Sequence, residues 1–278
     1  MSIRQTVDTL LRGMGQIMLQ DNALTGLLFL LGILVSSWQM FFAALLGLAA
    51  VTATAWLLRY ERKDIEHGLY GFNAALVGVG LLFFYQPGVL LAILIIIGAA
   101  LSAMIMHFMH WRRMSPFTFP FVLSAWAVIA FAGATGLLYS QPSSALPAAI
   151  DIVSALSLGF SQVMFQPNVL TGILFLVAIA VNSRTDALYA LLGSVAGTAI
   201  AMALSFPASF IAIGLFGYNA VLCGIAFTGK EKRMLALAIL SIALSVFIVR
   251  GFQLADIPPL TAPFVFATWI TLKIGKKL

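Results

Sequence analysis

Long stretches without a charged residue restrict the fold of this chain more than any other feature. The five longest cover 22–58, 67–111, 114–150, 152–183 and 187–229, and two shorter ones cover 234–249 and 257–272. A helix needs roughly 20 apolar residues to cross a bilayer, so the five long stretches each hold more than one segment. Of the 278 residues 62% are hydrophobic and 9% are charged, which excludes a water-soluble globular domain and a disordered chain. The sequence therefore predicts an all-α polytopic membrane protein.

Polar or turn-forming residues divide these stretches at 36–39, 85–87, 140–143 and 205–207. Ten spanning helices are expected, near 24–35, 40–58, 69–84, 88–108, 118–138, 170–181, 187–205, 214–228, 234–249 and 261–274. A less hydrophobic, amphipathic segment precedes each set of five, at about 3–20 and about 148–165. We expect these two segments to be re-entrant or interfacial rather than spanning.

The basic residues predict the orientation of the chain. If the N-terminus is cytoplasmic and each helix crosses once, 14 of the 15 Lys and Arg residues lie inside and only Arg250 lies outside. Such a bias is what the positive-inside rule requires. No secretory signal is expected, because Asp8 and Arg12 interrupt any apolar core at the N-terminus. The sequence therefore predicts a multi-pass protein of the plasma (bacterial inner) membrane, with both termini cytoplasmic.

Two motifs occur twice, 146 residues apart. NALTGLLFL at 22–30 recurs as NVLTGILFL at 168–176, and GLYGFNAALVG at 68–78 recurs as GLFGYNAVLCG at 214–224. A third pair, Phe-Thr-Phe-Pro-Phe and Leu-Thr-Ala-Pro-Phe, is offset by 143 residues. Chance similarity would not hold one register over such a length, so the chain contains a duplication. We expect a first repeat at 1–140 and a second at 141–278.

Five crossings in each copy are an odd number, so the second copy must enter the membrane from the opposite side. Inverted repeats place a permeation site at the midplane between them. Each repeat is thus expected to supply five transmembrane helices and one re-entrant pore helix. Matched positions of the two copies are expected to line one path.

The polar inventory argues against catalysis and against ion coupling. None of the nine acidic residues lies within an expected spanning helix, whereas proton-coupled and sodium-coupled sites usually need such a group. No paired carboxylates, nucleophile triad or metal-ligand spacing is present, so no enzyme, cofactor or metal is expected.

His107 and His110 are read as a helix end at headgroup level, with metal binding or ammonia conduction as alternatives. The net charge of +6 is read as membrane topology and not as a nucleic-acid partner.

Taken together, the doubled motifs resemble the urea transporter family. The resemblance is carried by Gln-x5-Asn-x-x-Thr-Gly, by Gly-Leu-Tyr-Gly-Phe-Asn with Gly-Leu-Phe-Gly-Tyr-Asn, and by the Thr-x-Pro-Phe pair, over roughly residues 14–272. It implies a homotrimer in the lipid bilayer, with one passive and selective urea pore through each protomer. It also implies five spanning helices and one tilted re-entrant helix in each half.

The resemblance implies that the pore residues occur in pairs, one from each half. It assigns Gln16 and Gln162 to the two ends of the filter, Phe72 with Leu76 and Tyr218 with Leu222 to the apolar slot, Leu19 and Phe165 to further slot-lining positions, and Thr118 and Thr261 to the pore centre. Asn73 and Asn219 belong to the signature, and we interpret them as structural amides that tie broken backbone together.

The chain departs from the family pattern at three places. Ala23 and Val169 follow the matched asparagines where the family usually has proline, and both filter positions are glutamine. Leu19 breaks the aromatic match with Phe165, which could loosen selectivity.

Two alternative functions stay open: a channel for ammonia, short amides or water on the same architecture, and a membrane-embedded structural or regulatory subunit with a blocked path.

Overall fold

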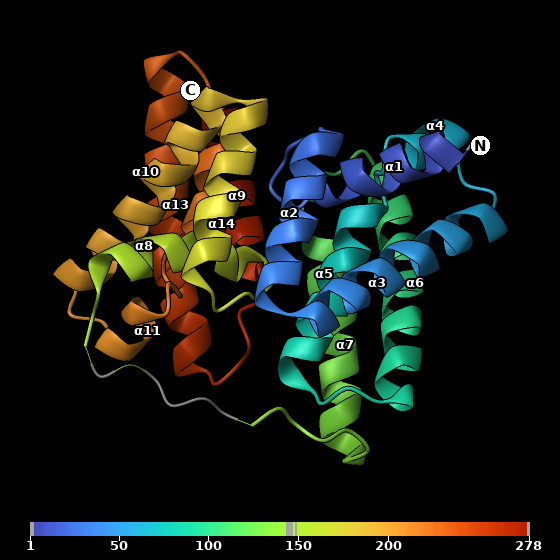
Figure 1. Ribbon diagram of the computed structural model, residues 1–278. Helices are drawn as coiled ribbons and strands as arrows, with labels where there is room; N and C mark the ends of the chain where they lie inside the picture. Colours follow the sequence, from blue (N-terminus) through green and yellow to red (C-terminus); the bar gives the residue numbers. More distant parts are fainter. Residues whose placement is uncertain (1–2, 143–146, 148, 277–278) are drawn as a thin grey trace. The chain divides into compact units, whose positions relative to one another are not determined.

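The computed structural model describes residues 3–142, 147 and 149–276, and within these ranges the regular structure is helical, without a β-strand. The chain forms two compact units, Met1–Ser143 and Ser144–Leu278 (Figure 1). Each is described below by itself. The composition of the helices confirms the predicted all-α polytopic membrane protein.

The described part of the first unit contains helices of very different lengths. They are α1 (Ile3–Gln16), α2 (Ala23–Ser36), α3 (Trp38–Leu57), α4 (Arg62–Glu66), α5 (Gly71–Phe84), α6 (Val89–Trp111) and α7 (Phe119–Thr135). Helix α3 packs against α5 and α6, and α6 packs against α7. Helix α1 contacts α2 and α5.

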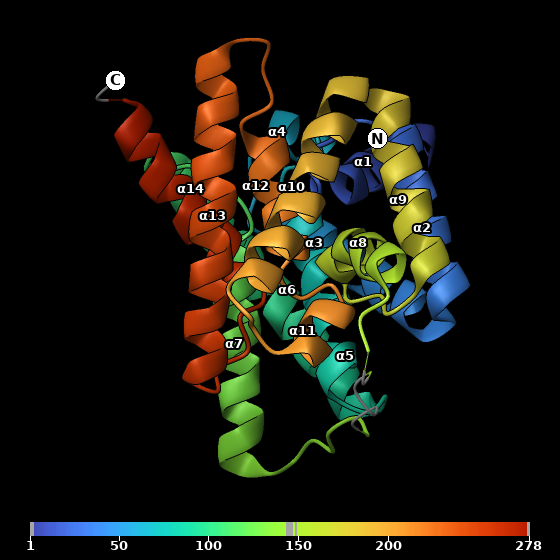
Figure 2. The same ribbon diagram turned by 90° about the vertical axis from the view of Figure 1, so that its left-hand side faces the viewer.

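The described part of the second unit repeats this order. It contains α8 (Ile152–Ser161) with the 3-10 turn η1 (Gln162–Met164), α9 (Val169–Asn182), α10 (Arg184–Ala203), α11 (Ala208–Ala212), α12 (Tyr218–Ala226), α13 (Lys232–Leu254) and α14 (Ala262–Gly275). Helix α13 packs against α12 and α14 (Figure 2). The matched helices α3 and α10 have 20 residues each, and α6 and α13 have 23 each.

Four of the described helices, α3, α6, α10 and α13, are long and apolar enough to cross a membrane alone. Helices α2, α5, α7 and α14 are apolar but have only 14 to 17 residues, which is about 21–26 Å against a hydrocarbon core of roughly 30 Å. Residues 152–164 and α9 form a pair bent by 74°. The ten expected helices are therefore present, but most are too short for a straight crossing. The number of crossings and the inverted relation of the halves stay predictions.

Two short helices, α4 and α11, were not expected from the sequence. Each has five residues and precedes a glycine with positive φ, Gly68 at 71° and Gly214 at 76°. These left-handed residues delay the next helix, so α5 begins at Gly71 instead of 69 and α12 begins at Tyr218 instead of 214. In place of one helix, each half therefore has a short helix, a turn and a second helix.

The repeat extends to the atoms that begin the helices. Asn22 Oδ1 accepts a hydrogen bond from Thr25 N at 2.9 Å, and Asn168 Oδ1 accepts one from Thr171 N at 3.0 Å. Each amide thus satisfies a backbone N–H that has no partner within its own helix. The repeated Asn-x-x-Thr residues therefore form the same helix cap in both halves.

Close backbone contacts join α1 to α2 and α8 to α9. A Cβ atom added at Gly26 would lie 1.8 Å from the carbonyl oxygen of Leu11. At the matched Gly172 it would lie 2.0 Å from the carbonyl oxygen of Ser157. Neither contact leaves room for a methyl group, so glycine at these positions sets the distance between each amphipathic helix and the next helix.

We expect Gly26→Ala to lower the free energy of unfolding by about 1–3 kcal/mol, because the new methyl group forces α1 and α2 apart. Thermal unfolding of the purified protein in detergent measures the change. Gly133→Ala is the matched control, because a Cβ at Gly133 meets no atom within 4 Å. Equal stability of the two variants would contradict the proposed packing.

Candidate functional site

The first helix of each half ends in the same turn. Leu19 has φ of 60°, its N–H donates to Gln16 O at 3.0 Å, and Gln20 N donates to Gly15 O at 3.1 Å. These two bonds around a left-handed residue form a Schellman motif, which usually has glycine at the left-handed position. The expected helix at 3–20 is therefore wrong at its end: α1 stops at Gln16, and 17–20 form this turn.

The matched turn follows α8. Phe165 has φ of 58°, Phe165 N donates to Gln162 O at 3.1 Å, and Gln166 N donates to Ser161 O at 3.1 Å. The expected helix at 148–165 begins later, because the Asp151 carboxylate accepts from Val153 N and Ser154 N and caps the helix at Ile152. Residue 148 lies outside the described residues.

Both turns leave helix carbonyls without helical partners. Gln20 Nε2 donates to Met18 O at 3.0 Å, and the matched Gln166 Nε2 donates to Met164 O at 2.6 Å. No hydrogen bond from the described residues reaches Ile17 O or Leu19 O. The last turn of a helix generally leaves about four such oxygens, which water or a ligand can satisfy. Carbonyl acceptors are thus available beside the half-exposed side chain of Leu19, which is 38% exposed.

The two filter glutamines have different surroundings. Gln16 is the last residue of α1, and its Nε2 donates to His67 O at 2.6 Å. Gln162 lies in η1, and no hydrogen bond joins its side chain to another described residue. Both are partly exposed. The amide oxygen of Gln16 stays available as an acceptor while its nitrogen is fixed to the loop before α5.

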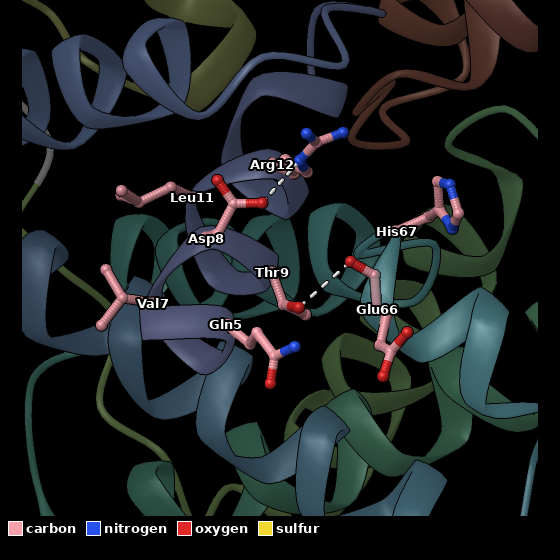
Figure 3. A pocket seen from close by; sticks show the side chains of 8 residues that line it. All are labelled: Gln5, Val7, Asp8, Thr9, Leu11, Arg12, Glu66 and His67. Carbon is pink, nitrogen blue, oxygen red and sulfur yellow. Dashed lines mark hydrogen bonds and ion pairs between the residues drawn. The ribbon is translucent and has the colours of Figure 1, made fainter. Parts of the chain in front are cut away.

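A charged cavity of about 560 Å³ lies beside α1 (Figure 3). Arg12 Nε is 2.7 Å from Asp8 Oδ2, and Arg12 Nη1 is 3.2 Å from Asp21 Oδ1. Glu66 and His67 also line the cavity, and Thr9 Oγ1 donates to Glu66 O at 3.1 Å. The first ion pair lies within α1, and the second connects α1 to the segment that follows its turn.

The second half has no counterpart of these ion pairs. Its matched residues are Ser154 for Asp8, Leu158 for Arg12, Pro167 for Asp21 and Ala212 for Glu66. The two halves therefore share the backbone structure of this region but differ in its charged residues.

The residues assigned to the apolar slot lie on α5 and α12. Phe72 and Leu76 are buried on α5, one turn apart and hence on one face. Tyr218 and Leu222 are buried at matched positions of α12. Tyr218 differs from Phe72 in one contact, because its hydroxyl donates to Leu260 O at 2.5 Å.

In each unit an asparagine joins two helices: Asn73 joins α5 to the start of α7, and Asn219 joins α12 to the start of α14. Asn73 Oδ1 accepts from Phe121 N at 3.0 Å, and its Nδ2 is 3.4 Å from Phe117 O. Asn219 Oδ1 accepts from Phe264 N at 3.0 Å, and its Nδ2 donates to Leu260 O at 3.2 Å. Both amides are fully buried. Each links helices that are far apart in sequence.

The two threonines stand directly at the asparagine-linked turns. Thr118 and Thr261 are buried and precede α7 and α14. The residues before them, Phe117 and Leu260, have φ of 45° and 46°. Within the first unit, Gly13 of α1 and Gly71 of α5 are also in close backbone contact. The structure thus brings α1, the start of α5 and the start of α7 together, and it repeats this arrangement in the second unit.

Comparisons with known proteins identify the family of this chain. A family model described as urea transporter matches residues 7–276. The chain belongs to the urea transporter family. It is 30% identical to urea transporter 1 of Rattus norvegicus over 85% of this chain and 68% of that protein. It is 28% identical to urea transporter 1 of Mus musculus over 99% and 78%, and 29% identical to that of Ovis aries over 98% and 78%.

Membership in the urea transporter family confirms the resemblance found in the sequence and makes this a membrane transport protein by family, not an enzyme. It does not test the individual pore residues, whose roles stay predictions.

Sequence reasoning missed the roles of Gln20 and Gln166, whose side chains donate hydrogen bonds to carbonyls of the two turns. Their signal was present, since they are identical residues at the 146-residue offset.

We expect Asn73→Leu to lower the free energy of unfolding by about 1–3 kcal/mol, because it leaves the buried N–H of Phe121 without its acceptor. Asn219→Leu is expected to cost a similar amount. Denaturation followed by tryptophan fluorescence measures both. Gln86→Leu is the control, since this exposed amide bonds to Ser140 O and to no other described residue. A loss at Gln86 as large as at Asn73 would refute the role given to the buried amide.

Proposed function

We propose that this protein is a passive, selective channel for urea. The observation that carries the proposal is the doubled set of parts in a member of the urea transporter family: a left-handed helix end, an aromatic–leucine pair and a buried threonine in each half. Both halves contribute matched residues to one path through the protomer in this proposal. Gln16 and Gln162 belong to its ends, and Thr118 and Thr261 to its centre.

The chemistry of urea explains why these groups suit it. Urea is flat and neutral, with four N–H donors and one carbonyl acceptor, so crossing hydrocarbon without partners costs several kcal/mol. The carbonyls released by the turn after α1, together with the Gln16 amide oxygen, supply acceptors for the N–H groups. The threonine hydroxyls can both donate and accept. Acceptors along one edge of the solute thus replace its lost hydration.

The apolar pairs account for the rejection of ions. Phe72, Leu76 and Leu222 have no polar side-chain atom, and the hydroxyl of Tyr218 is engaged by Leu260 O. An ion cannot exchange its hydration shell for such walls, whereas a flat neutral solute passes. No acidic residue lies in α5, α7, α12 or α14, which favours conduction without a coupled proton or sodium ion.

The wider setting is part of the proposal. We place the channel in the plasma (bacterial inner) membrane, with both termini in the cytoplasm, because the Lys and Arg residues follow the positive-inside rule in that orientation. We also propose a homotrimer with a separate pore in each protomer, as the family resemblance implies. Urea, the lipid bilayer and the other protomers of the trimer are its proposed partners.

Proteoliposomes tested by stopped-flow light scattering should show urea flux that needs neither a sodium nor a proton gradient. The absence of an acidic residue from α5, α7, α12 and α14 is the reason. Comparing urea with formamide, thiourea and ammonia separates a urea channel from the related alternative. Uphill accumulation of urea on imposing either gradient would rule out the passive mechanism, and faster flux of ammonia than urea would favour the alternative.

Gln16→Trp should reduce urea flux to the level of protein-free vesicles, because an indole at the proposed mouth blocks the path. Gln16 is partly exposed, so the variant is expected to fold. Val89→Trp is the control for a bulky residue at a site 80% exposed and outside the proposed path. Undiminished flux in a folded Gln16→Trp protein would exclude Gln16 from the path. Absence of urea flux in the unmodified protein would favour a structural or regulatory subunit.

A further inference from the structure

A polar cluster lies inside the second unit, behind the helix that carries Tyr218 and Leu222. The thiol of Cys223 on α12 faces the hydroxyls of Ser241 and Ser245 on α13 and of Thr268 on α14. Thr271 follows Thr268 on α14 by less than one turn. All five side chains are at most 1% exposed. None of them belongs to the proposed pore residues.

The Thr271 hydroxyl has no hydrogen bond to a described residue, and the hydroxyls of Ser241 and Thr268 face only the weakly bonding thiol of Cys223. Such hydroxyls normally bond to a carbonyl one turn earlier on their own helix. Other hydroxyls of this protein do so, including Thr52 with Leu48 O and Ser245 with Ile242 O. Ser124 and Thr228 also lack such a bond, but here three hydroxyls without an oxygen or nitrogen partner among the described residues occur on two helices that pack together.

The matched place in the first unit is apolar. By the register of the repeat, Cys223 matches Val77, and Ser241, Thr268 and Thr271 match Gly98, Ala125 and Val128. The register is fixed by Ser102 and Ser245, which bond to Ala99 O at 2.8 Å and Ile242 O at 2.7 Å.

Direct packing fills this place in the first unit. A Cβ at Gly98 would lie 2.9 Å from Val77 Cγ1 and 3.6 Å from Val128 Cγ2. The surrounding helices therefore pack without any polar group at these four positions. The second unit has a thiol and three hydroxyls there, which packing alone does not require.

We propose that the Cys223 cluster is a binding site for ordered water, held by Ser241, Thr268 and Thr271 between α12, α13 and α14. Water fits the chemistry, because it can donate to and accept from several hydroxyls and a thiol at once, and buried waters typically make about three hydrogen bonds. A charged ligand does not fit, since the facing groups named here are all neutral.

Crystal structures of the full-length protein test the site directly. The unmodified protein should show ordered water in hydrogen-bond contact with at least two of the three hydroxyls. The variant Ser241→Gly, Thr268→Ala, Thr271→Val carries the residues of the first unit and should lose that water. If this triple variant does not fold, Thr271→Val alone, which keeps the side-chain shape, should displace or weaken the water peak. Hydroxyls turned to their own helix carbonyls, with no water between them, would overturn the proposal.

Infrared spectroscopy gives a second readout, because Cys223 is the only cysteine in the chain. In D₂O, the S–H band of the folded protein should convert to S–D if the thiol bonds to exchanging water. The hydroxyl-free variant should keep its S–H band at a higher frequency. Ser102→Ala, at a bonded hydroxyl of the first unit, should leave the band unchanged. An S–H band that does not exchange in the unmodified protein would contradict the proposal.

Discussion

A backbone amide or carbonyl without a partner is costly in hydrocarbon, by roughly 2–7 kcal/mol, and this constraint governs every break in the helices of this protein. The proposed site residues lie next to the breaks before α5 and α7, so a continuous helix at either place would move these residues. Asn73 satisfies the N–H of Phe121, and Gln20 satisfies Met18 O. Side-chain amides thus replace the helical bonds that each break removes. The second unit meets the same constraint with Asn219 and Gln166.

The same constraint explains why the turns can also serve transport. A Schellman motif satisfies some of the last carbonyls of a helix and leaves others open. At α1, the open oxygens include Ile17 O and Leu19 O. An open carbonyl is tolerated at membrane depth only where a polar solute or water reaches it. The backbone feature that is costly for folding is therefore what a neutral hydrogen-bonding solute can use.

Much of the fold could be predicted from charge spacing and turn residues. All ten expected helices are present, because uncharged stretches and polar breaks such as Tyr85-Gln86-Pro87, directly after α5, mark their ends. The left-handed residues could not be predicted from local preference. Leu19, Phe117 and Phe165 have positive φ, a conformation usually taken by glycine, so the identity of these residues gives no local signal for it. The site positions came from the repeated motifs, whereas the bonds of Asn73 and Tyr218 required the structure.

The two halves of this chain share caps, left-handed turns and asparagine bridges, yet the Asp8–Arg12–Asp21 ion pairs occur in one half only. In a symmetric dimer of identical subunits, each substitution would appear twice, and a charge introduced in one copy would be imposed on the other. Covalent fusion of the copies removes that coupling. Each half can then acquire its own mutations, so an ion pair such as Arg12–Asp21 can arise in one half while the shared architecture is maintained.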